Sequence, residues 1–97
     1  MEDLFELEDI VNYNNPMICF CRDMVNIVDT AFPVESWVIR SSDYYGNVEL
    51  FIRFTTREQC MRIVYLDRIN EPDYMGRMAN QIISDVNKFK SLHQLFP

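Results

Sequence analysis

The chain places a helix-like segment on either side of a segment with strand-like alternation, which restricts it to a mixed α+β fold. The first helical segment opens with Asn15 as N-cap and Pro16 at the first helical position, and Pro33 ends it. We predict a helix from about residue 16 to 32. Its apolar residues recur at intervals of three and four: Met17, Phe20, Cys21, Met24, Val25, Val28, Ala31 and Phe32.

The second helical segment is predicted to run from about residue 72 to 91. Pro72 suits the first helical position, and Asp73 suits the first turn, where the helix dipole favours an acid. One apolar stripe follows: Met75, Met78, Ala79, Ile82, Val86 and Phe89. The opposite side is polar, so we expect this helix to bury a single face.

Between the helices, period-two alternation predicts strands. The clearest case has four apolar residues separated by more polar ones: Val48, Leu50, Ile52 and Phe54. A preceding strand is predicted over Glu35–Ser42, which is centred on Trp, Val and Ile. Residues 43–47 have the length and composition of a hairpin turn, so the two strands are expected to pair antiparallel.

Residues 57–69 allow two interpretations. The stretch Thr55–Gln59 contains the Thr-x-x-Glu and Thr-x-x-Gln spacing of a capping box, which is typical of a helix start. The residues after it have strand propensity, and as a strand they would place Met61, Ile63 and Tyr65 on one face. We favour a third antiparallel strand, because a helix here would have no polar side.

The expected architecture is one compact domain over residues 1–97, in the order helix, two or three antiparallel strands, C-terminal helix. A chain of 97 residues that is 48% apolar suits a single core. One or both helices should cover one face of the sheet, because a small sheet needs such cover for stability.

Acidic residues are concentrated at the N-terminus. The chain carries nine basic and fifteen acidic side chains, for a net charge of −6. Residues 1–9 contain five carboxylates and no basic side chain: Glu2, Asp3, Glu6, Glu8 and Asp9. Apolar residues lie between these acids. Residues 1–13 are therefore interpreted either as a short helix with acids at its N-terminal end or as an acidic docking segment for a basic partner.

Several functional classes fit the composition poorly. The acidic balance argues against direct nucleic-acid binding, and two glycines leave no Gly-rich phosphate loop. A single histidine, His93, and three cysteines, Cys19, Cys21 and Cys60, match no triad or zinc pattern. We expect no enzyme activity, cofactor, metal or disulfide. In the absence of a signal peptide or an apolar membrane-spanning run, we expect a cytoplasmic protein in a reducing compartment, with no membrane partner.

Residues 48–70 resemble part of an RNA-recognition motif. Their sequence, VELFIRFTTREQCMRIVYLDRIN, is similar to the third strand and second helix of that family, in which strand aromatics stack on bases. The resemblance places the stacking positions at Glu49 and Phe51 and the leading basic position at Asn47, so a carboxylate replaces one aromatic. The family's last strand has no counterpart, since residues 72–92 are predicted to be helical. A ferredoxin-like nucleic-acid-binding module is therefore the alternative interpretation.

The small size, acidity and α+β layout of the chain resemble the small phage- or virus-encoded inhibitors of host defence enzymes, including anti-CRISPR proteins. Several of those proteins pair helices with a three-stranded antiparallel sheet, and some present carboxylates to a nucleic-acid-binding cleft. The resemblance implies a non-catalytic inhibitor or modulator of a larger protein that is basic or handles nucleic acid. The partner-binding candidates are the five N-terminal acids together with Tyr44 and Tyr45, because tyrosine is enriched at interface hot spots. A homodimer acting as a chaperone-like adaptor is a further interpretation.

Overall fold

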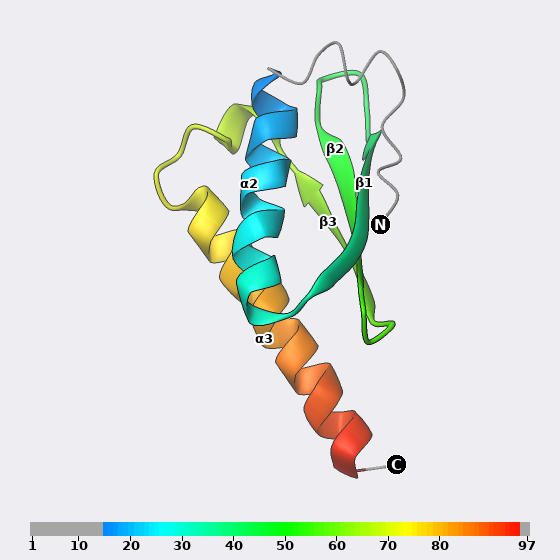
Figure 1. Ribbon diagram of the computed structural model, residues 1–97. Coiled ribbons are helices and arrows are strands. Elements are labelled where there is room, and N and C mark those ends of the chain that lie inside the picture. The colour runs from blue at the N-terminus through cyan, green and yellow to red at the C-terminus, as the bar shows by residue number, and fades with distance from the viewer. Residues whose placement is uncertain (1–14, 96–97) are drawn as a thin grey trace.

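The computed structural model describes residues 15–95 and contains two helices and three strands (Figure 1). In chain order the elements are α2 (Pro16–Ala31), β1 (Val34–Ser41), β2 (Val48–Phe54), β3 (Gln59–Val64), the 3-10 turn η1 (Leu66–Arg68) and α3 (Tyr74–Leu95). The predicted α+β fold, with a helix, an antiparallel sheet and a C-terminal helix, is confirmed. The acidic segment over residues 1–13 lies outside the described residues.

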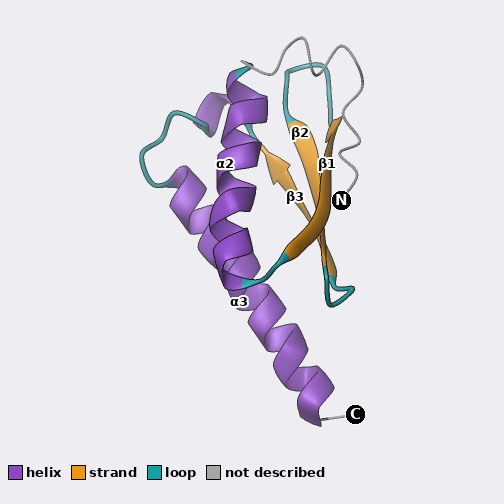
Figure 2. Cartoon of the chain, in the orientation of Figure 1, coloured by secondary structure: helices purple, strands orange, loops and turns teal. Residues whose placement is uncertain are grey.

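The strands form one antiparallel sheet in the order β1-β2-β3. Trp37 of β1 lies opposite Ile52 of β2, so both point to the same side. Alternation along β2 then places three nearly inaccessible side chains on this inner face: Leu50, Ile52 and Phe54. Both helices lie on the inner side of the sheet (Figure 2). The period-two pattern in the sequence therefore identified the buried face of β2 correctly.

The ambiguous segment is a strand. β3 pairs with β2 along its whole length without a register shift. Met61 and Ile63 share the outer face, as predicted, and Tyr65 follows directly after the strand. The capping-box spacing leads to no helix, because residues 55–57 form the hairpin loop between β2 and β3, and Arg57 there has a φ of 79°. The helix that the RNA-recognition resemblance requires is not formed here, so the ferredoxin-like fold is wrong for this chain.

The two helices begin differently. The Asn15 side chain accepts a hydrogen bond of 2.8 Å from Met17 N, which confirms the predicted N-cap. The second helix begins at Tyr74, two residues after the predicted start, because Pro72 and Asp73 belong to a turn in which Tyr74 N donates to Glu71 O at 3.2 Å. The Tyr74 ring stacks on Phe20 with centroids 5.4 Å apart, which joins the start of α3 to α2.

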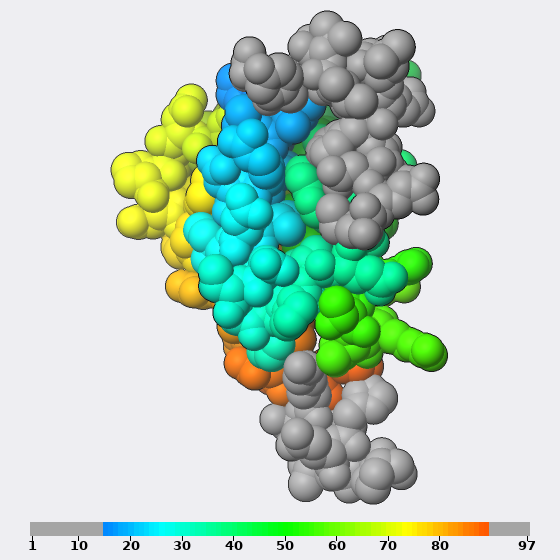
Figure 3. All heavy atoms as spheres, in the orientation of Figure 1, coloured from blue at the N-terminus to red at the C-terminus, as the bar shows by residue number. Residues whose placement is uncertain are grey.

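The core lies between the inner face of the sheet and the two helices. Its largest inaccessible side chains come from both layers: Cys21, Met24, Val28, Leu50, Ile52, Phe54, Val64 and Ile82. In Figure 3, α2, in blue to cyan, covers the front of this core. The C-terminal part of α3 continues past the end of the sheet (Figure 1).

Candidate interaction surface

The two tyrosines predicted to bind a partner lie in the turn between β1 and β2. Tyr44 is fully exposed and Tyr45 is 82% exposed. Neither phenol ring is packed into the core. Large amphipathic side chains in such a position can be buried by a partner without breaking any contact with the core.

The turn that carries these tyrosines is held by the carboxylate of Asp43. One oxygen, Oδ1, accepts hydrogen bonds from Tyr45 N at 2.8 Å and from Asn47 N at 3.4 Å. The other, Oδ2, accepts from the Asn47 side-chain amide at 2.9 Å. These bonds favour the charged carboxylate, so the Asn47 side chain first, and then the Tyr45 amide, lower the pKa of Asp43. The backbone beneath Tyr45 is therefore fixed before any partner binds.

We expect the Asp43 carboxyl to titrate below the ordinary range of aspartate, and the amide shifts of Tyr45 and Asn47 to follow the same midpoint. Because the folded-state pKa is lowered, the stabilisation by Asp43 is present above the unfolded-state pKa. It is lost as the pH falls through the folded-state value. A pH titration followed by NMR measures the carboxyl midpoint and the two amide shifts. The substitution Asp43→Asn should abolish the transition that the amides of Tyr45 and Asn47 share. A midpoint at or above that of a free aspartate would contradict the hydrogen-bonded turn.

The turn is also joined to the segment after β3. Asn47 Oδ1 accepts a hydrogen bond of 2.9 Å from Leu66 N. Gly46 has a φ of 89°, and a Cβ on it would lie 2.7 Å from Leu66 Cδ2, so this position requires glycine both for its backbone and for the close approach. Tyr45 and Leu66 line a hollow together with Asn47 and Asp67. We call Tyr44, Tyr45 and Leu66 the tip surface.

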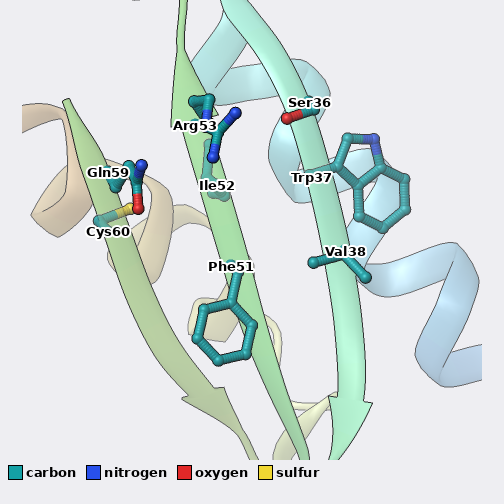
Figure 4. A pocket seen from close by; sticks show the side chains of 8 residues that line it. All are labelled: Ser36, Trp37, Val38, Phe51, Ile52, Arg53, Gln59 and Cys60. Atoms are coloured by element: carbon teal, nitrogen blue, oxygen red, sulfur yellow. The ribbon is translucent and has the colours of Figure 1, made fainter. Parts of the chain in front are cut away.

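A second accessible surface is the outer face of the sheet, on the side opposite the helices. Its middle row is apolar and consists of Val38, Phe51 and Met61. The Arg40 guanidinium lies 5.1 Å from the centroid of the Phe51 ring, and it also pairs with Glu49 at 3.3 Å. Figure 4 shows a hollow along this face, with Phe51 beside Val38, and Arg53 reaching toward Ser36 further along the strands.

The sequence predicts the exposed turn that carries Tyr44 and Tyr45, and it does not indicate the apolar row of the outer face. The sequence indicates Phe51 only as an aromatic of the RNA-recognition resemblance. The available signal was that β2 and β3 carry apolar residues at both odd and even positions. The predicted acids Glu2, Asp3, Glu6, Glu8 and Asp9 lie outside the described residues, so their position relative to the tip surface stays a prediction.

Two of the three cysteines, Cys21 and Cys60, are poorly suited to nucleophilic chemistry. Burial raises the pKa of the Cys21 thiol to about 12, and burial also raises the pKa of Cys60, so the reactive thiolate is disfavoured at both. Among the side chains that the structure describes, those of residues 15–89, no group of three or more His, Cys, Asp or Glu is arranged to hold a metal ion. No helix in the described part of the chain is long and apolar enough to cross a membrane. Comparison with protein-family models, with curated proteins and with solved structures found no match.

Proposed function

We propose that this protein is a non-catalytic inhibitor or modulator that binds a larger protein through its tip surface. The observation that carries the proposal is the pair of exposed tyrosine rings on a turn fixed by Asp43. Binding requires ordering of the groups at an interface, and that ordering costs free energy. A turn already held by hydrogen bonds avoids part of this cost. Tyrosine adds a large contact area with only two side-chain torsions to fix.

We call residues 1–9 the acidic block. The proposed partner has a basic surface, because this block supplies five carboxylates within nine residues. Excluding that block, the chain has nine basic and ten acidic side chains and is nearly neutral. Charges at the rim of an interface mainly accelerate encounter with an oppositely charged surface. A protein that handles nucleic acid presents such a surface, so the acidic block and the tip surface would play different roles in the same complex. A phage or viral anti-defence role is the specific form of this proposal that the layout resembles.

Site-specific photo-crosslinking tests whether the tip surface binds a protein. A photoreactive residue in place of Tyr45 is expected to give a covalent adduct with a protein of the native host lysate. The same residue in place of Gln81, which is exposed on α3, should give no such adduct. Equal crosslinking from both positions, or from neither, would contradict the proposal.

Single-stranded nucleic acid binding on the outer face is the second candidate. It is favoured by Phe51, which lies in the middle of an open sheet face with Arg40 above its ring and the exposed Arg53 on the same strand. Glu49 on the same face argues against nucleic-acid binding, because its carboxylate repels phosphate. Binding of labelled single-stranded RNA that weakens steeply with salt, and that Phe51→Ala abolishes, would favour this candidate over the protein-binding one.

A further inference from the structure

The two edge strands of the sheet differ in how well they are protected against pairing with another chain. β1 has a register irregularity between Val34 and Ser36, and the residue between them is the charged Glu35. Bulges and charged side chains of this kind discourage edge-to-edge pairing. β3 has an unbroken register and contains no proline or lysine. Its one charged residue, Arg62, extends to the inner side, where it pairs with Asp85 of α3, and its Nη1 also donates a hydrogen bond of 2.9 Å to the Met61 carbonyl oxygen.

The backbone of β3 presents a regular row of groups at its open edge. Phe54 N donates to Glu58 O at 2.9 Å, which determines the alternation of bonded pairs between β2 and β3. Three residues bond toward β2: Cys60, Arg62 and Val64. Three others direct their N–H and C=O groups away from it: Gln59, Met61 and Ile63. The N–H of Tyr65 follows the same alternation, since it points away from β2 and donates to the Tyr74 hydroxyl at 3.1 Å.

Accessible apolar surface lies on both sides of this edge. On the outer side, Met61 is 41% exposed, and Tyr65 is similarly exposed. On the inner side, a groove between β3 and α3 carries Cys60, Val86 and Phe89 beside polar residues that include the Arg62–Asp85 ion pair, and Phe89 is 46% exposed. An added strand would alternate its side chains between these two surfaces, as in the binding of peptides at the edge of a sheet.

We propose that β3 is a dimer interface, where it pairs antiparallel with β3 of a second copy around Met61. The two strands then form the centre of a six-stranded sheet, with all four helices on one side. Pairing around Met61 joins the two open-edge rows, because Gln59 lies opposite Ile63 of the second copy and Met61 lies opposite its own equivalent. Each of these facing pairs is of the hydrogen-bonded type. A two-fold interface requires such self-complementarity.

The charges at the edge are compatible with a second copy as the occupant. In this register Arg62 lies opposite Cys60 of the second copy, so no like charges are directly opposite, and the two diagonal Arg62 side chains are each paired with Asp85 of their own copy. The loop with Arg57 approaches the exposed Tyr65 of the other copy, where a guanidinium and an aromatic ring attract each other. The open-edge N–H and C=O groups of each copy bond to those of the other, and the Met61 carbonyl oxygen, which accepts from Arg62 Nη1, has a second lone pair for this bond. The interface is separate from the tip tyrosines, and this inference goes beyond the proposed function.

Sedimentation analysis of the full chain over a wide concentration range tests the interface. The wild-type protein is expected to dimerise, and Met61→Lys should raise the dissociation constant of the dimer by more than about tenfold, because two ammonium groups would meet near the two-fold axis. Ile27→Lys is the matched control. Ile27 is 39% exposed on α2, so this substitution adds the same charge at the same degree of exposure and should leave the dimer intact. Circular dichroism checks that both variants fold.

A crosslink tests the register without depending on the lysine variant. In a hydrogen-bonded antiparallel pair the Cα atoms are about 5.5 Å apart, which is within the range of a disulfide. Met61→Cys should therefore form an interchain disulfide under mild oxidation, identified by mass spectrometry of the linked peptide, whereas Ile27→Cys should not. A wild-type chain that remains monomeric at all concentrations, a dimer that Met61→Lys leaves unchanged, or the lack of an interchain disulfide in the Met61→Cys variant would each overturn the proposal.

Discussion

Phe54→Ala is expected to lower the free energy of unfolding by about 3–5 kcal/mol. Phe54 is inaccessible to solvent and packs edge-to-face against Phe32, with ring centroids 6.4 Å apart. Truncation removes the transfer free energy of the ring and leaves a cavity between the sheet and the helices, which backbone pairing on β2 prevents from closing. The same strand offers a matched control. Phe51 lies on the outer face, so Phe51→Ala should cost no more than about 1.5 kcal/mol.

Urea unfolding of both variants, at one protein concentration and followed by circular dichroism, measures the difference. The fixed concentration matters because self-association would add to the apparent stability. Similar losses for the two variants would mean that the two faces of β2 are equally buried, which contradicts a sheet covered by helices on one side only.

The helices and strands that were predicted correctly from the sequence are those whose type is determined by a local residue pattern. Asn15 and Pro16 define a helix start through groups that lie within a few residues of each other, and the apolar stripe of α2 has a period that only a helix satisfies. In β2 the alternation over residues 48–54 also decides which face is buried. Such signals need no knowledge of distant residues, so they predict element types well.

The parts that were wrong or undecided depend on contacts between distant segments. The capping-box spacing in residues 55–59 is a valid local signal, but pairing of β3 with β2 overrides it, because a strand there completes the inner face with Val64. Pro72 likewise suits a helix start. The helix begins at Tyr74, whose ring and hydroxyl contact Phe20 and Tyr65, respectively, and these partners lie far from each other in the sequence.

The residues of the tip surface also divide into those that a local sequence pattern predicts and those that depend on distant contacts. The composition of residues 43–47 predicted a turn, which placed Tyr44 and Tyr45 in solvent. Nothing local indicated that Leu66 would join them, because that contact depends on the hydrogen bond from Leu66 N to Asn47. The open edge of β3 could not be predicted from the sequence either, since a strand can be recognised as an edge strand only when the order of the whole sheet is known.

Neutralising the acidic block and truncating a tip tyrosine are expected to have different kinetic effects on the complex with the partner found by crosslinking. Replacing the five N-terminal carboxylates with amides should slow association and flatten its salt dependence, while dissociation changes little, because exposed charges act mainly on encounter. Tyr45→Ala should raise the dissociation rate by roughly 30-fold, which corresponds to a hot spot of about 2 kcal/mol. Stopped-flow mixing at several salt concentrations separates the two rates.

A scrambled order of residues 1–13 is the control for the block, because it keeps the charge and removes any specific fit. It should associate at the wild-type rate if the acids only steer the encounter. The competing interpretation is that residues 1–11 pack on the domain through Leu4, Leu7 and Val11. Deleting residues 1–9 discriminates between the two: an unchanged melting temperature with slower association is the expected result. A large loss of stability, with unchanged affinity in the folded fraction, would contradict a partner-facing role, since the apolar residues of the segment would then be part of the core and their acids merely solvated.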